Sequence, residues 1–177
     1  GFPDICNLPG NELIEALEQS YSRVGIDDTM VICRSNKRAN IYNNGIRSRI
    51  LYREEELSSG DMIMIAKNNY FWTAEYKEMD FIANGDIAIV RRVRREREMY
   101  GFRFADVTVR FPDYDDFEIE ATLLLDTLQS ESPALTHEQS DKLFNSIMED
   151  YADIPQKREQ LKKLKVDPYF NALQVKY

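Results

Sequence analysis

Two short motifs between residues 60 and 90 constrain the fold of this chain more than any other feature. The first is Gly60-Asp-Met-Ile-Met-Ile-Ala-Lys-Asn-Asn-Tyr70, and the second is Asn84-Gly-Asp-Ile-Ala-Ile-Val90. Each joins a turn dipeptide to a short apolar run. Asn-Gly is the strongest short hairpin signal, because both residues tolerate the positive φ of a type I′ turn. The two motifs therefore predict neighbouring strands of a small antiparallel barrel.

After these motifs, apolar and polar residues continue to alternate along the chain, and this period of two predicts further strands. A switch of parity near Ala105-Asp106 predicts a β-bulge, which barrels use at corners. Four or five strands within about seventy residues fit a small SH3-like barrel. The predicted strands are Met62–Ala66, Ile87–Val93, Tyr100–Phe111 and Phe117–Leu125.

The residues before the barrel have a different pattern. Apolar residues at helical spacing predict a helix over Glu12–Val24, with Asn11 as its N-cap. A buried strand is expected over Thr29–Cys33, followed by a second helix from about 36 to 50, capped by Ser35. Helix, strand and helix in this order predict part of an α/β layered domain.

Helices return after the barrel. Thr136-x-x-Gln139 is a capping-box pattern, and Pro155 suits the first turn of another helix. A strand is expected near the C-terminal Tyr177. Because the chain begins without Met and stops within this strand, we expect a piece of a longer polypeptide. The predicted fold is α+β overall, an all-β barrel inserted in an α/β layer, with domains 1–57, 58–130 and 131–177.

The net charge of −8 argues at first against nucleic acid, because phosphate binding depends on Lys and Arg. The distribution weakens this objection: residues 34–53 carry six cations and no acid, and a second basic cluster spans Arg91–Arg97. No apolar run approaches the ~20 residues of a membrane helix, and no secretion signal appears. Two cysteines make no disulfide framework, so we expect a cytoplasmic protein without membrane partners.

The segment that follows Cys33 is the first candidate site. Ser35 and Asn36 lie at a helix N-terminus, whose orphan amides and dipole favour anions. Lys37 and Arg38 add positive charge, so a nucleic-acid phosphate is a reasonable ligand. Alternatively, Ser35 only caps the helix, and the cations are solvated on its outer face without binding a ligand.

A second candidate is the loop Lys67–Trp72, which combines a cation, two amides and three aromatic rings. Basic residues interleaved with rings can stack the bases of a single strand. Alternatively, the rings pack on the barrel and the asparagines close turns. No phosphate loop, G-x-S-x-G motif or metal triad is encoded, so no complete active site is predicted.

The motifs together resemble superfamily 1 DNA helicases of the RecD/Dda type, which include the exodeoxyribonuclease V alpha subunit. Ile32–Arg47 is similar to the family's strand followed by T-N-K-x-x-x-x-x-N-x-x-I-R in the second RecA-like motor domain. Gly60–Asn68 and Asn84–Ile87 resemble the G-D-x-V-M-x-x-K-N … N-G-D-x-G-x-V signature of the SH3-like domain inserted there. Ser35 replaces the usual Thr, and Ala88 the usual second Gly.

This resemblance implies an ATP-driven 5′→3′ translocase that unwinds DNA. ATP and Mg²⁺ would be bound by the parent protein, and we expect neither cofactor binding nor ATPase activity from this chain alone. The implied partner is single-stranded DNA, held by Ser35, Asn36, Lys37, Arg38, Asn43, Arg47, Lys67 and Asn68. The alternative function is a protein-interaction module, in which Tyr70, Phe71, Trp72 and Tyr76 line a peptide groove on the barrel.

Overall fold

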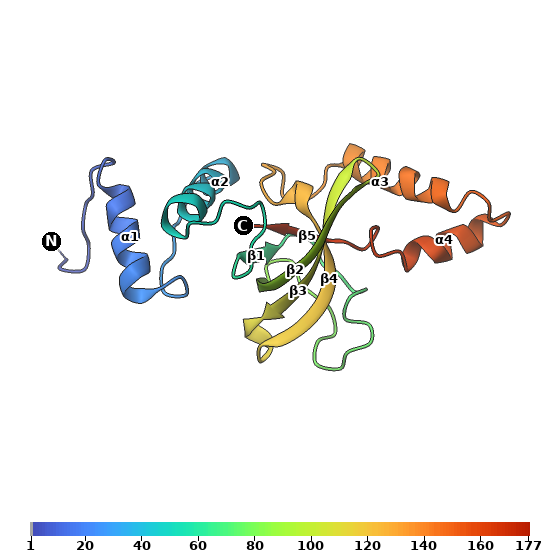
Figure 1. The fold of residues 1–177 in the computed structure, drawn as a ribbon, viewed down its shortest axis with the longest axis horizontal. Coiled ribbons are helices and arrows are strands. Elements are labelled where there is room, and N and C mark those ends of the chain that lie inside the picture. The colour runs from blue at the N-terminus through green and yellow to red at the C-terminus, as the bar shows by residue number, and fades with distance from the viewer. Residues whose placement is uncertain (1) are drawn as a thin grey trace. The chain divides into compact units, whose positions relative to one another are not determined.

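The computed structural model describes residues 2–177 and has an α+β fold that contains a closed five-stranded barrel (Figure 1). The chain forms two compact units. The first ends at Glu54, and the second runs from Glu55 to Tyr177.

The first unit is helical. Helix α1 spans Leu13–Val24, and its N-cap is Glu12, one residue after the predicted Asn11. Gly25 ends this helix with a φ of 87°, and its N–H donates to the Tyr21 carbonyl at 3.1 Å. A positive φ of this kind is accessible to glycine at little cost, which explains the position of the helix end.

Helix α2 spans Asn36–Gly45 and begins at the predicted cap, Ser35. A π-helical turn, η1, continues it over Ile46–Ile50, and the Leu51 N–H donates to the Ile46 carbonyl at 2.9 Å. The predicted second helix is therefore confirmed over its full length, with a wider last turn.

The predicted strand over Thr29–Cys33 is wrong: this segment has no regular secondary structure. Exposure alternates along it, and Met30 and Ile32 are 84% and 88% exposed. A strand is held by ladder hydrogen bonds to a neighbour, and among residues 2–177 no strand pairs with this segment. The α/β layer predicted for residues 1–57 is thus not formed by the described residues.

The second unit contains the barrel, whose strands follow the order β1-β2-β3-β4-β5 around a closed sheet. All neighbours are antiparallel except β4 and β5, which are parallel. The predicted strands are confirmed within two residues at their ends, except that β2 continues six residues beyond the predicted Val93. Their bounds are β1 Met62–Ile65, β2 Ile87–Met99, β3 Phe102–Phe111, β4 Phe117–Leu124 and β5 Leu173–Lys176.

The two turn motifs close this barrel. Gly60 has a φ of 86°, and its N–H donates to the Val90 carbonyl at 2.6 Å. The carboxylate of Asp61, which is 1% exposed, accepts from the Ser58 N–H at 2.7 Å. At the second motif Gly85 has a φ of 98°, and the Asp86 carboxylate accepts from the Ala83 N–H at 2.7 Å. Each motif therefore pairs a glycine of positive φ with a carboxylate that closes the turn.

Strand β2 contains two bulges that the sequence did not predict. Val90 is buried and Val93 packs against the barrel core, although they are three residues apart. Register shifts between Val90 and Arg92 and between Val93 and Arg95 each add one residue to β2. These bulges keep pairs of arginines outside the barrel while the valines face inward.

Strand β3 is regular, so the bulge predicted near Ala105-Asp106 is wrong. Its register with β4 is unbroken from Phe104↔Leu124 to Phe111↔Phe117. The parity switch arises because both faces of β3 are covered. Val107 and its alternate neighbours face the barrel core, whereas Phe104 belongs to a second core against the helices.

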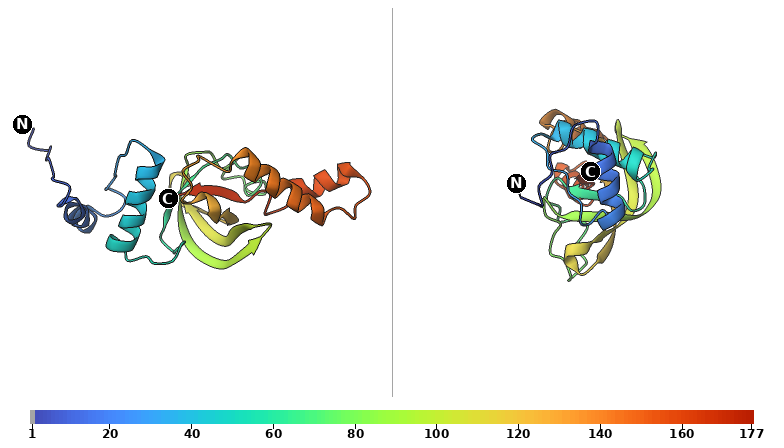
Figure 2. Two further views of the ribbon diagram at one scale, coloured as in Figure 1. Left: turned by 90° about the horizontal axis from the view of Figure 1, so that it is seen from above. Right: turned by 90° about the vertical axis from the view of Figure 1, so that its left-hand side faces the viewer.

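Two helices form this second core with the outer face of the sheet. Helix α3 spans His137–Asp150 and leads away from the barrel, and α4, Lys157–Lys165, leads back (Figure 1; Figure 2). The predicted capping box of Thr136 and Gln139 is present. Two 3-10 turns, η2 Pro112–Tyr114 and η3 Leu125–Thr127, flank β4.

The last strand differs from its expected place. We predicted that residues 131–177 return to the domain of residues 1–57. Instead β5 pairs with β1 and β4 and completes the barrel. The apolar side chains of Leu173 and Val175 supply the reason, because both are buried in the barrel core.

Candidate nucleic-acid interface

The first turn of α2 presents four of the predicted site residues together. The Ser35 hydroxyl accepts from the Arg38 N–H at 3.3 Å, which satisfies one of the orphan donors of the helix. Ser35, Asn36, Lys37 and Arg38 are all exposed. A helix start with two cations attracts anions through its amides, its dipole and its side-chain charge.

Two further predicted site residues lie near the end of α2 and are less exposed than those of its first turn. Asn43 is half-buried, and Arg47 in the π-helical turn is only 9% exposed. The wider π turn carries Arg47 into the first unit, next to Ile46, the other buried residue of this turn. The sequence spacing alone did not predict this burial.

The two asparagines of the loop after β1 have structural roles. The Asn68 Oδ1 accepts from the Asn84 N–H at 2.7 Å, which joins the two signature motifs. The Asn69 Oδ1 accepts from the N–H groups of Phe71 and Trp72 at 3.0 and 3.3 Å. The alternative interpretation, that the asparagines close turns, is therefore confirmed for Asn69, whereas Asn68 links two loops.

The aromatic residues of this loop do not form one groove. The Trp72 indole N–H donates to the Asn171 carbonyl at 2.8 Å, and its ring packs against the barrel core. Tyr76 packs edge-on against Phe117, with ring centroids 5.1 Å apart. Tyr70 is different, because it remains 63% exposed.

An open cavity of about 490 Å³ adjoins this loop. The loop contributes Lys67, Asn68, Tyr70 and Phe71, and α4 and the segment before β5 contribute Lys165 and Phe170. The sequence analysis missed the last two residues, since they lie about a hundred positions away. Their only sequence signal is the apolar strand that follows them, which pairs beside β1.

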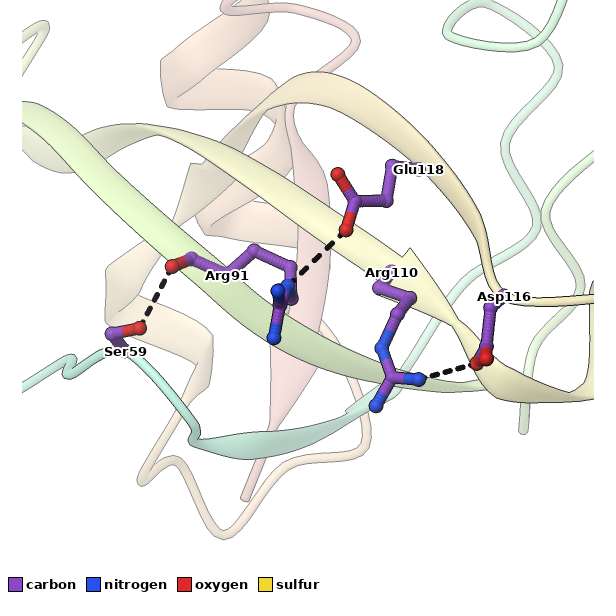
Figure 3. Close-up of polar contacts among 5 residues, drawn as sticks. All are labelled: Ser59, Arg91, Arg110, Asp116 and Glu118. Carbon is purple, nitrogen blue, oxygen red and sulfur yellow. Dashed lines mark hydrogen bonds and ion pairs between the residues drawn. The ribbon is translucent and has the colours of Figure 1, made fainter.

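Three arginines of the basic run of β2 pair with acids on neighbouring strands of the sheet. Arg91 pairs with Glu118 at 3.2 Å, as Figure 3 shows, and Arg94 pairs with Glu120 at 2.8 Å. Arg97 pairs with Asp106. In the same view the Ser59 hydroxyl donates to the Arg91 carbonyl and Arg110 pairs with Asp116 (Figure 3). Three of the five arginines in this run therefore form a ladder of ion pairs, whereas Arg92 and Arg95 are exposed and have no ion-pair partner among residues 2–177.

Within residues 2–177, no helix has both the length and the apolar character needed to cross a membrane. A comparison with protein-family models found no match. A search of curated proteins found no similar protein.

Proposed function

We propose that this chain is a part of a RecD/Dda-type DNA helicase that contributes contacts to single-stranded DNA and does not hydrolyse ATP by itself. The observation that carries this proposal is the exposed, Ser35-capped first turn of α2, within a segment of six cations and no acid. The motifs that resemble the helicase family lead directly from this turn into the barrel. In the parent protein, ATP and Mg²⁺ would be held by the first motor domain.

Two features of the fold support this proposal. The five-stranded barrel is compatible with an SH3-like domain, and both signature motifs serve to close it. The exposed segment around Met30 and Ile32 also has the alternation of a strand, and in a RecA-like layer it would pair with neighbouring strands of the parent.

The proposal is tested by fluorescence anisotropy with a labelled oligothymidylate at several salt concentrations. Because each phosphate contact to a single strand contributes about 0.7 to the salt slope, Lys37→Ala/Arg38→Ala should lower the slope by about 1.4. The matched control is Lys157→Ala/Arg158→Ala, which removes the same residue types from the first turn of α4. Binding that ignores salt, or equal effects of both variants, would remove the claim of phosphate contacts at α2.

The alternative function, a protein-interaction module, is supported by the exposed pair Tyr70 and Phe81. Their rings stack with centroids 5.1 Å apart. The anisotropy experiment separates the two functions, because a peptide-binding barrel would leave the oligonucleotide unbound at low salt.

A further inference from the structure

We propose that the cavity beside β1 binds one nucleotide unit of a single strand, with the base on Tyr70 and the phosphate at Lys67 and Lys165. This inference deepens the proposed function, on which it rests, by assigning a second contact that lies wholly in the barrel unit. The cavity of about 490 Å³ is within the range of small-molecule sites, roughly 300–1,000 Å³.

The charge of the cavity favours a phosphate. The chain has 31 acidic residues, yet no Asp or Glu is among the described residues that line this cavity. Two of the lining residues are cations, Lys67 and Lys165, and both are exposed. Neither side chain has an ion-pair partner in the part of the chain that the structure describes, in contrast to the paired arginines of β2. Their charge is thus available to an anion.

The aromatic residues favour a planar base. The Tyr70 ring is 63% exposed and stacks on Phe81 at an interplanar angle of 23°. Phe81 thereby fixes the orientation of a ring that would otherwise rotate, which lowers the entropy lost on binding. Phe71 and Phe170 also line the cavity and supply apolar surface. Base stacking of this kind is tolerant of sequence, so we expect little preference among bases.

Asn171 holds the two sides of the cavity together. Its carbonyl accepts from the Asn69 side-chain amide and from the Trp72 indole, both at 2.8 Å. Its own side-chain amide donates to the carbonyls of Lys165 and Asp167 at 2.9 and 2.8 Å. One residue therefore ties the Tyr70 loop to the end of α4, so the backbones on the two sides of the cavity are held together before a ligand arrives.

The base contact is tested with the full chain, by comparing an oligothymidylate with an abasic sugar-phosphate strand of the same length. Stacking predicts that the abasic strand binds about ten-fold more weakly, and that Tyr70→Ala removes this difference. Tyr52→Ala, at an exposed tyrosine of the other unit, serves as the control and should keep the difference. Equal affinity for the two strands in the unmodified chain would overturn the base contact.

The phosphate contact is tested by two pairs of variants. Lys67→Ala and Lys165→Ala should each lower the salt slope by about 0.7. Lys77→Ala and Lys163→Ala are matched controls, because these lysines lie in the same loop and helix but do not line the cavity. Unchanged slopes for the cavity variants would overturn the assignment.

A titration with thymidine monophosphate distinguishes this inference from the proposed function. Trp72 is the single tryptophan of the chain and lies edge-on to Phe71, with ring centroids 4.9 Å apart, so its fluorescence reports on the cavity. If no oligonucleotide binds but the monophosphate changes this fluorescence in a Tyr70-dependent way, the cavity site stands and the helicase proposal fails. If the monophosphate and the oligonucleotide both leave the fluorescence unchanged, the cavity site is overturned, whatever the α2 variants show.

Discussion

The two units of this chain differ most in how much apolar surface they bury. In the barrel unit, side chains such as Ile65, Val107 and Phe111 are fully buried. Among the described residues of the first unit, only Ile46 and Arg47 are buried, and α1 has no buried residue. Since apolar burial is the main favourable contribution to folding, the barrel should be stable while the two N-terminal helices remain marginal.

The largest expected effect is the loss of a leucine from the barrel core. Leu123 of β4 is fully buried in the core. Leu123→Ala should lower the free energy of unfolding by about 2–5 kcal/mol, through lost transfer free energy and a new cavity. Urea unfolding followed by Trp72 fluorescence measures this change. A loss below about 1 kcal/mol would mean that the barrel is not the stable unit of the chain.

A smaller effect is expected where the second core meets the helices. The Tyr151 hydroxyl donates to the Asp167 carboxylate at 2.7 Å, and this carboxylate also accepts from the N–H groups of Tyr169 and Phe170. Tyr151→Phe should therefore lower the free energy of unfolding by about 1 kcal/mol. Tyr76→Phe is the control, because Tyr76 lies in the loop between β1 and β2 and packs its ring against Phe117.

The effect of Tyr151→Phe on the free energy of unfolding should depend on pH in a defined direction. The hydrogen bond to Asp167, with burial as the second cause, raises the pKa of Tyr151 to about 12. Because the pKa is raised in the folded state, the hydrogen bond contributes fully to the free energy of unfolding below the ordinary tyrosine pKa of about 10. This contribution is lost as the pH rises through about 12. The difference between the unmodified chain and Tyr151→Phe should therefore be constant near neutrality and shrink above pH ~10. A difference that grows in this range would contradict the assigned hydrogen bond.

The smallest effect is expected from the matching leucine substitution in the first unit. Leu17 of α1 is only half-buried and lines an open groove of about 450 Å³ between α1 and α2. Leu17→Ala should change the free energy of unfolding by less than about 1 kcal/mol. It should leave the urea unfolding transition that Trp72 fluorescence follows unchanged, whereas Leu123→Ala should shift this transition. If both leucine variants shift this transition equally, the comparison between the units fails.

The barrel could be predicted from sequence because its signals are local. Gly60-Asp61 and Asn84-Gly85 define the closing turns, and alternation defines β4 without exception from Phe117 to Leu123. Alternation identifies the two faces of a strand but does not tell whether both are covered. For this reason the parity switch in β3 does not indicate a bulge, and the sequence did not predict the bulges of β2.

The strand predicted in the first unit is wrong and the cavity was predicted only in part, because both depend on contacts that are distant in sequence. The apolar run Thr29–Cys33 has the composition of a strand, but a strand also requires a partner, which sequence composition does not supply. The cavity depends on pairing between β1 and β5, which brings Lys165 and Phe170 to the loop of Tyr70. Such long-range contacts leave no local pattern, so only the loop half of this site was predicted.

Hydrogen exchange with and without an oligothymidylate tests the central claim most directly, since it reports on both units in one sample. We predict slower exchange at residues 35–38 and 67–74 when the oligonucleotide is present, and unchanged exchange along the arginine ladder of β2. Protection confined to β2, or no protection anywhere at low salt, would contradict the claim that this chain holds a single strand at α2 and at the cavity.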